Sequence, residues 1–194
     1  MEKVISNHDG YKIMIDHHQS PTINANQTLS DTTICSTAEL VYEFINKLEF
    51  NLSSESAIAL YTGIVTDSGS FKYNLVSSRT HLIISKLLSY NIDHSEIHKN
   101  LYDNNSISRM KLLGRCLTSN FKIFHDFNTA LFYLTKKDLE ECEFKKGDTE
   151  GFVNMPLSLK GVVFSALFIE HVDGIKISFR SKSSFDVNKF SRNH

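Results

Sequence analysis

The segment YKIMIDHH, residues 11–18, is an apolar run with three polar residues directly after it. The run YKIMI, residues 11–15, predicts a short buried strand. Asp16, His17 and His18 then lie at the carboxyl end of that strand, which is where open α/β sheets bind their ligands. Adjacent histidines project in different directions, so one can bind a metal while its neighbour faces a substrate. A surface turn that contains two histidines is the alternative, and the spacing alone favours neither.

Helical patterns follow this strand. After a polar loop over residues 19–33, apolar residues at helical spacing predict a series of helices. They are expected over residues 36–48 (with Ser36 or Thr37 as N-cap), from 53 or 54 to 65, and over 77–90, 93–102 and 107–117. The composition of TDSG, residues 66–69, predicts a loop between the second and third of these helices.

From residue 121 the pattern changes to one typical of strands. Strands are expected over residues 121–126, 130–135, 161–171 and 175–180, with a short charged helix over 136–144. The dipeptide Asp173-Gly174 is a strong hairpin signal between the last two strands. We therefore expect an α/β lobe over residues 1–103, a helical linker over 104–118, and a smaller α+β lobe with a mostly antiparallel sheet over 119–194.

The composition excludes several classes of protein. Hydrophobic residues make up 41% and charged residues 22% of the 194 residues, which is enough to build a core and excludes wholesale disorder. A net charge of −1 argues against long duplex nucleic acid as a partner, because non-specific duplex binders carry a basic excess. Three widely spaced cysteines favour reduced thiols in a cytoplasmic protein. The sequence predicts neither a membrane span nor a signal peptide.

Two further groups are candidates for binding. Asp67 precedes a glycine-containing loop and can join an imidazole in holding a hard or borderline cation, although Asp beside Ser-Gly more often stabilises a turn. Arg180, Ser181 and Lys182 end the last predicted strand, and their guanidinium, hydroxyl and ammonium groups suit a phosphate. A solvated strand end is the more frequent explanation for such a cluster. The residues alone leave both alternatives open.

Three segments together resemble the DHH phosphoesterase family. They are IDHHQSP (residues 15–21), TGIVTDSGSFKY (62–73) and the late strand KISFRSK (176–182). The first two are similar to the family's motifs, and the third is similar to the substrate-binding strand of the DHH-associated domain. The resemblance is greatest to the branch of bifunctional oligoribonuclease/pAp phosphatases, also called nanoRNases.

The resemblance implies an α/β fold, with an incomplete DHH lobe whose mainly parallel sheet is flanked by helices and a smaller α+β DHH-associated lobe. It also implies hydrolysis of phosphate esters at a site with two Mn²⁺ ions. Carried over by position, His17 and Asp67 would bind the same metal ion. His18 would face the scissile phosphate as a catalytic residue, and Asp16 would support the pair of histidines.

The same resemblance implies the substrates. They would be short oligoribonucleotides (nanoRNA) or 3′-phosphoadenosine 5′-phosphate (pAp). Neither long duplex nucleic acid nor a membrane is an expected partner. A homodimer is expected for this branch. Arg180, and with less support Ser181 and Lys182, would hold the substrate's phosphate or ribose.

The chain also departs from the family's pattern. Family members carry an Asp-rich motif and a metal-bridging Asp before the DHH segment, and a glycine-rich motif near the end. Here fifteen residues precede Asp16, and the chain stops at DVNKFSRNH, so it resembles an internal piece of a longer protein. A metal held by one imidazole and one carboxylate is under-coordinated. We therefore expect a hydrolase as the parent protein and little or no activity from these 194 residues alone.

Three alternatives remain open. The first is a catalytically inactive nucleotide-binding or interaction module with the same fold. The second is a single-strand exonuclease of the RecJ type, which the compact length and the absence of basic runs disfavour. The third is a class II inorganic pyrophosphatase, which the KISFRSK strand disfavours.

Overall fold

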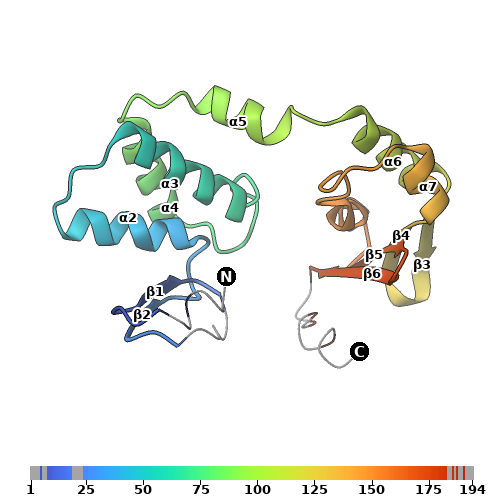
Figure 1. Ribbon diagram of the computed structural model, residues 1–194, viewed down its shortest axis with the longest axis horizontal. Coiled ribbons are helices and arrows are strands. Elements are labelled where there is room, and N and C mark those ends of the chain that lie inside the picture. Colours follow the sequence, from blue (N-terminus) through green and yellow to red (C-terminus); the bar gives the residue numbers. More distant parts are fainter. Residues whose placement is uncertain are drawn as a thin grey trace. The chain divides into compact units, whose positions relative to one another are not determined.

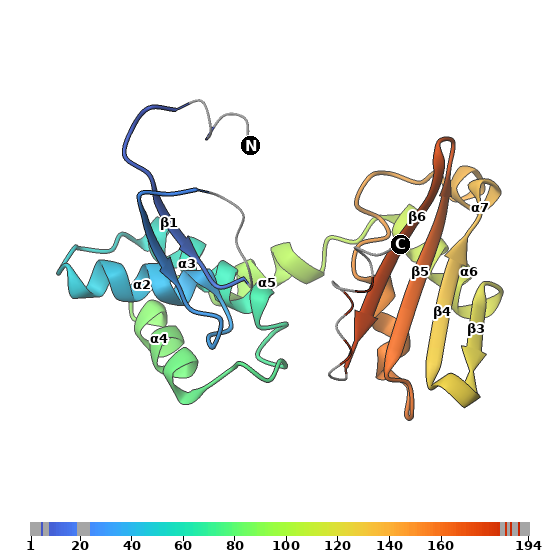
Figure 2. The same cartoon turned by 90° about the horizontal axis from the view of Figure 1, so that it is seen from below.

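The computed structural model describes residues 5, 8–18, 24–182, 185, 187 and 190. The chain divides into two compact units, residues 1–103 and 104–194, which are drawn in Figures 1 and 2. Within the described residues, no helix is long and apolar enough to cross a membrane.

The first unit contains a two-stranded parallel sheet. Strand β1 (Ile13–Asp16) pairs with β2 (Gln27–Ser30), and Asp16 lies opposite Ser30. The sequence predicted a buried strand over residues 11–15, but β1 is exposed or half-buried and includes Asp16. The sequence also assigned residues 27–30 to a loop, which is wrong. All four side chains of β2 are exposed, so the strand carries no apolar pattern, and only its backbone pairing with β1 defines it.

Four helices lie between residues 37 and 102 of the first unit. They are α2 (Thr37–Lys47), α3 (Ser54–Asp67), α4 (Ser78–Leu88) and α5 (His94–Tyr102). Side chains of Ser36, Ser53, Ser77 and Asp93 cap their amino ends, as such short polar side chains commonly do. Helices α2, α3 and α4 pack together around a core that includes Ala57, Ile64, Val65 and Leu87, each of which is fully buried. In Figure 1 these helices lie on one side of the small sheet.

Helix α3 is longer than the sequence predicted. Thr66 and Asp67 were expected in a loop, but they form its last residues and Ser68 is its C-cap. The hydroxyl of Thr66 donates to the carbonyl oxygen of Thr62 at 2.9 Å, so it is satisfied within the helix and does not compete with the helical backbone. The chain turns only at Gly69, whose φ is +58°. Asp67 is therefore carried by the end of a helix.

The second unit is a four-stranded sheet with helices packed against it. It comprises α6 (Ile107–Thr118), β3 (Phe121–Phe124), β4 (Thr129–Leu134), α7 (Lys136–Glu141), β5 (Phe164–His171), β6 (Gly174–Ser181) and the 3-10 helices η1 (His125–Phe127) and η2 (Phe152–Ser158). The strand order is β3-β4-β5-β6, and β4 and β5 are parallel while the two outer pairs are antiparallel. Figure 2 shows these four strands side by side. The predicted α/β class is confirmed, although neither 3-10 helix was predicted.

Residues 104–118, expected as a linker, are packed into the second unit. Helix α6 contacts β3, β4 and α7. Its Leu112 and Cys116 are fully buried in a core that also contains Phe132 of β4 and Phe152 of η2.

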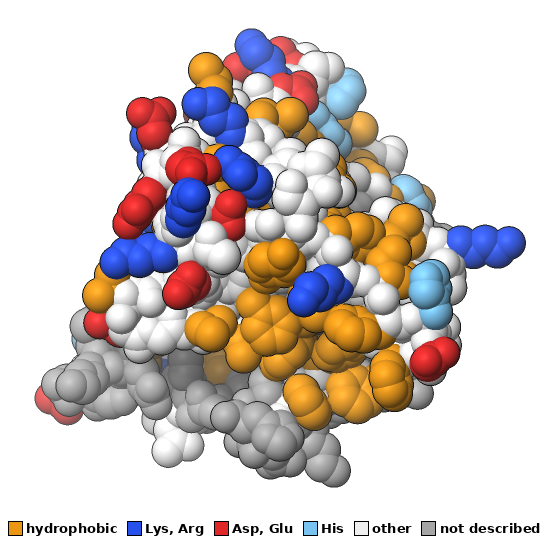
Figure 3. Space-filling model, turned by 90° about the vertical axis from the view of Figure 1, so that its right-hand side faces the viewer, with side chains coloured by type: hydrophobic (Ala, Val, Ile, Leu, Met, Phe, Trp, Pro, Cys, Tyr) orange, Lys and Arg blue, Asp and Glu red, His pale blue; other side chains and the backbone are white. Residues whose placement is uncertain are grey.

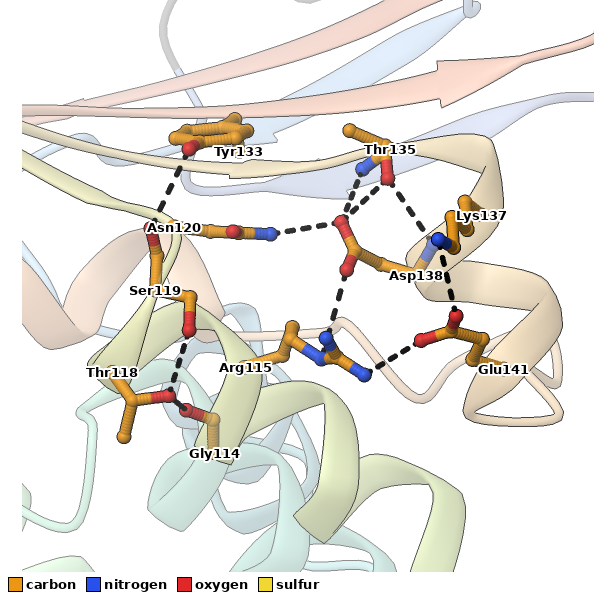
Figure 4. Close-up of polar contacts among 10 residues, drawn as sticks. All are labelled: Gly114, Arg115, Thr118, Ser119, Asn120, Tyr133, Thr135, Lys137, Asp138 and Glu141. Atoms are coloured by element: carbon orange, nitrogen blue, oxygen red, sulfur yellow. Dashed lines mark hydrogen bonds and ion pairs between the residues drawn. The ribbon is translucent and has the colours of Figure 1, made fainter.

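Polar side chains also fasten α6 to α7. Figure 4 shows Asp138 of α7 accepting hydrogen bonds from Thr135 and from the side chain of Asn120, while Arg115 of α6 lies between Asp138 and Glu141. Asp138 and Asn120 are both buried. No buried side-chain nitrogen or oxygen among the described residues lacks a hydrogen-bond partner, so this network joins α6, Asn120 and α7 without an unsatisfied buried group.

Apolar side chains remain exposed at the β3 edge of the second unit. Ile123, Phe124 and Phe127 lie on β3 and on η1, which follows it, and Phe127 is 74% exposed. Figure 3 shows apolar side chains gathered on this side of the unit.

Candidate functional site

Asp16 orders the polar segment that follows β1. Its Oδ1 accepts hydrogen bonds from the backbone N–H groups of His17, at 2.8 Å, and His18, at 3.1 Å. The same oxygen lies 2.7 Å from Nδ1 of His18. These bonds, led by the one from the His18 side chain, lower the pKa of Asp16 below its usual value. Because a carboxylate can only accept, Nδ1 of His18 carries the proton and Nε2 is turned away from Asp16.

The two histidine side chains differ in their surroundings. Their ring centroids are 4.5 Å apart and their planes are nearly perpendicular, at 89°. His17 is half-buried, while His18 is exposed. The pair therefore presents two imidazoles in different directions, as a site with one ligand for a cation and one group for a substrate requires.

Asp67 is bound to the beginning of α2. The hydroxyl of Ser36 donates to Oδ2 of Asp67 at 2.7 Å, and the same hydroxyl accepts from the backbone N–H of Ala38 as the N-cap of α2. Ser36 is fully buried, and Asp67 is exposed. The sequence predicted Ser36 or Thr37 as the helix cap, and no local pattern predicted the contact of Ser36 with a residue 31 positions later.

The loop before α2 also reaches the DHH segment. Strands β1 and β2 are parallel, so their carboxyl ends lie at the same edge of the sheet. The backbone N–H of Asp31, directly after β2, donates to the carbonyl oxygen of Asp16 at 3.2 Å. Residues 31–36 therefore run from Asp16 to the hydroxyl that binds Asp67.

A buried carboxylate lies next to this loop. Glu39, in the first turn of α2, is 1% exposed. It accepts hydrogen bonds from Sγ of Cys35 at 2.7 Å and from Oγ1 of Thr80 at 3.0 Å. Burial, reinforced by Glu39, raises the pKa of the Cys35 thiol to about 12. No sequence pattern predicts this cluster, because Glu in a first helical turn is usually a solvated residue that complements the helix dipole.

A groove of about 650 Å³ lies elsewhere in the first unit, between the two strands and α2. It is mainly apolar, with Ile15, Leu29, Leu40 and Phe44 among its lining residues. None of the predicted site residues lines it, so the groove is separate from the DHH segment.

Comparison with known proteins places these features in context. No family model matches the chain. The "probable bifunctional oligoribonuclease and PAP phosphatase NrnA" of Streptococcus mutans is 28% identical over 185 residues, which cover 95% of this chain and 58% of the relative. The bifunctional oligoribonuclease and PAP phosphatase NrnA of Bacillus subtilis is 26% identical over 95% of this chain and 59% of its own length. The predicted resemblance is confirmed.

A solved structure extends the likeness to the fold. An exopolyphosphatase-related protein from Bacteroides fragilis matches 97% of this chain with a TM-score of 0.92 and 42% sequence identity. The match covers 56% of that protein. The chain thus spans little more than half the length of the NrnA relatives and of this structural neighbour.

The described residues do not form a complete metal centre. The imidazole of His17 and the carboxylates of Asp16 and Asp67 are donors of the kind that Mn²⁺ takes. However, no group of three or more His, Cys, Asp or Glu side chains is placed to hold a metal ion within the part of the chain that the structure describes. A metal site of the kind that the NrnA resemblance implies would need further ligands.

The remaining predicted residues belong to the second unit. Arg180 is exposed on β6, lies opposite Ser165, and donates from a guanidinium nitrogen to the carbonyl oxygen of Phe179 at 2.8 Å. Ser181 and Lys182 follow it, and the backbone N–H of Lys182 donates to Val163. The three residues are consecutive at the end of an edge strand, so Arg180 projects from the opposite face of the sheet to Ser181.

Proposed function

We propose that this chain belongs to a metal-dependent phosphoesterase that hydrolyses short oligoribonucleotides, pAp, or both. The observation that carries the proposal is the DHH segment at the end of β1, where Asp16 holds His18 by its Nδ1 at 2.7 Å. This arrangement occurs in a chain that matches NrnA proteins over about 95% of its length. The activity, the substrates and the metal all belong to the proposal.

Within this proposal each residue of the DHH segment has a role. His17 and Asp67 would hold one metal ion, and the chemistry that such an ion supplies is Lewis-acid activation of water and of a phosphate. His18 faces the scissile phosphate through Nε2. Asp16 keeps the ring of His18 in one tautomer and orientation, as outer-sphere carboxylates commonly do for histidines at metal sites.

Substrate recognition is assigned to Arg180, Ser181 and Lys182. A guanidinium can bind a phosphate through two parallel hydrogen bonds, and an ammonium adds a point charge. The net charge of −1 supports a small substrate, because a long strand would need an extended basic surface. Three buried free thiols support a reducing compartment, the cytoplasm.

The experiment compares this chain with an extended protein that also contains any further residues its reading frame encodes at either end. Both are assayed for pAp hydrolysis and for shortening of a diribonucleotide in the presence of Mn²⁺. We expect turnover from the extended protein and little or none from the chain alone, because the described residues lack a three-ligand cluster. Robust turnover by the chain alone would overturn this expectation.

Point variants of the extended protein test the assignment of the ligands. His17→Ala and Asp67→Ala should each abolish turnover and weaken Mn²⁺ binding. His94→Ala and Asp126→Ala are matched controls, since both residues are exposed and lie outside the DHH segment, and they should leave turnover unchanged. Near-normal rates in both ligand variants would show that the assignment is wrong.

A second candidate function is a catalytically inactive nucleotide-binding module. The absence of a three-ligand cluster among the described residues favours it. The two candidates predict different results for the extended protein, because the inactive module would bind pAp in calorimetry without releasing phosphate at any Mn²⁺ concentration.

A further inference from the structure

The hydroxyl of Ser36 makes two hydrogen bonds with opposite directions. It accepts from the backbone N–H of Ala38 at 3.1 Å and donates to Oδ2 of Asp67 at 2.7 Å. A serine hydroxyl has one proton and two lone pairs. Since Ala38 supplies its own proton, and a carboxylate has none to give, the proton of Ser36 points to Asp67. The direction of this bond is therefore determined by the chemistry of its partners.

Ser36 itself is held firmly in the first unit. It is fully buried, as is its neighbour Cys35. The thiol of Cys35 donates to Glu39, and Glu39 also accepts from Thr80 of α4. The beginning of α2 is thus bound to α4 by side chains that are themselves buried. Because Ser36 is fully buried and caps α2, its hydroxyl is more restricted than the exposed side chain of Asp67.

Asp67, in contrast, would be free to move without this bond. It is the last residue of α3 and its side chain is exposed. Oδ1 accepts no hydrogen bond from the described residues, so Ser36 supplies the only one that its carboxylate receives from them. Exposed side chains exchange between staggered rotamers. The bond from the hydroxyl of Ser36 therefore determines that Oδ2 of Asp67, and not Oδ1, faces the protein.

We propose that Ser36 is a positioning residue for Asp67: its hydroxyl holds Oδ2 and leaves Oδ1 without a hydrogen bond from the described residues, available to a ligand. This inference rests on the proposed function, in which Asp67 is a ligand at that site. It adds to that function a residue whose hydroxyl prepares the carboxylate before any ligand arrives, so that less conformational entropy is lost on binding. Helix capping alone would not require the bond to Asp67.

Four variants separate positioning from capping. Ser36→Ala removes both hydrogen bonds, and Ser36→Asp keeps an acceptor for the Ala38 N–H but has no proton to donate at neutral pH. Ser36→Thr keeps both functions. Ser53→Ala is the matched control, because Ser53 caps α3 through the N–H of Ser56 and makes no contact with Asp67.

The measurement is the set of three-bond couplings that report χ1 of Asp67, recorded by NMR on the 194-residue chain without metal. We expect a single rotamer in the wild type, in Ser36→Thr and in Ser53→Ala, and averaging over rotamers in Ser36→Ala and Ser36→Asp. A single rotamer in Ser36→Ala, or averaging already in the wild type, would overturn the proposal. If the threonine variant does not fold, the two alanine variants decide the question.

The result does not depend on whether the proposed function is right. The couplings are measured without metal or substrate, whereas the function is tested by Mn²⁺ binding and turnover of the His17→Ala and Asp67→Ala variants. Averaged couplings in Ser36→Ala together with normal turnover in Asp67→Ala would confirm the geometry and refute the function. In the extended protein, we expect Ser36→Ala to weaken Mn²⁺ binding several-fold and Ser53→Ala to leave it unchanged.

Discussion

Asn120 donates a hydrogen bond from its Nδ2 to Oδ2 of Asp138 at 2.8 Å, and both side chains are buried. The same oxygen accepts from the backbone N–H and the hydroxyl of Thr135, at 2.9 and 2.6 Å. The guanidinium of Arg115 lies 3.7 Å from the other oxygen. One carboxylate therefore connects the end of α6, the residue before β3 and the first turn of α7 (Figure 4).

Removal of this carboxylate should destabilise the second unit strongly. In Asp138→Ala, the buried amide of Asn120 and the N–H of Thr135 lose their acceptor, and an unsatisfied buried donor costs ~1–3 kcal/mol. We expect the free energy of unfolding to fall by about 3 kcal/mol, as measured by urea denaturation. Lys137→Ala is the control, because its side chain is 82% exposed and should change stability by no more than about 0.5 kcal/mol. Equal effects of the two substitutions would contradict this account.

The same residue predicts how stability depends on pH. Burial alone would raise the pKa of Asp138, but the hydrogen bonds from Thr135 and Asn120 and the charge of Arg115 outweigh burial and lower it. A carboxyl whose pKa is lower in the folded state stabilises the fold above its unfolded pKa, about 4, and loses that contribution as the pH falls through its folded pKa. The free energy of unfolding should therefore fall below about pH 4. The fall should be smaller in Asp138→Asn, and identical pH profiles for the two proteins would rule out this origin.

Two glycines should respond to alanine in opposite directions. Gly69 has a φ of +58°, and an added Cβ would lie 2.7 Å from the ring of Tyr73. Gly69→Ala should lower the free energy of unfolding by about 1–2 kcal/mol, because alanine is strained in the left-handed region. Gly114 lies inside α6 with nothing within 4 Å of an added Cβ, so Gly114→Ala should raise stability by about 0.5–1 kcal/mol. Thermal denaturation of both variants checks the difference in sign.

The three cysteines should be unreactive in the folded chain. All are free and buried, and burial is the main reason why the pKa values of the Cys35 and Cys116 thiols rise to about 12. Because the thiolate is the reactive form, we expect labelling by a disulfide reagent near pH 8 to be more than ~100-fold slower in the folded chain than in guanidinium. Rapid labelling of one thiol in the folded chain would show that the structure around that cysteine opens locally.

Local patterns predicted those parts of the fold whose signal is contained in neighbouring residues. The apolar run of β1, an N-cap at Ser36 or Thr37 and the hairpin at Asp173-Gly174 are of this kind. Strand β2 was missed because its exposed side chains carry no periodic signal. The end of α3 was misplaced because Thr66 and Asp67 have the composition of a loop.

In the candidate site, too, contacts between neighbouring residues could be predicted and contacts between distant residues could not. Asp16, His17 and His18 are adjacent, and their mutual contacts follow from a turn at the end of a strand. The bond between Ser36 and Asp67 joins residues 31 positions apart, and the bond between Glu39 and Thr80 joins residues 41 apart. Such contacts arise only when helices pack, and a single sequence contains no signal for them. The roles of His17 and Asp67 as ligands remain predictions.

The contact between Asp16 and His18 provides the sharpest test of how the DHH segment works. In the extended protein, Asp16→Ala removes the acceptor for the N–H groups of His17 and His18 and for Nδ1 of the His18 ring. We expect kcat for pAp hydrolysis to fall by ~10–100-fold, which is typical for loss of a group that orients a site histidine. Asp16→Asn keeps an acceptor oxygen at the same position but removes the negative charge, so it should retain most of the activity if orientation is what matters. Equal losses in the two variants would show instead that the site needs the charge of Asp16, and the role of orienting His18 would then be wrong.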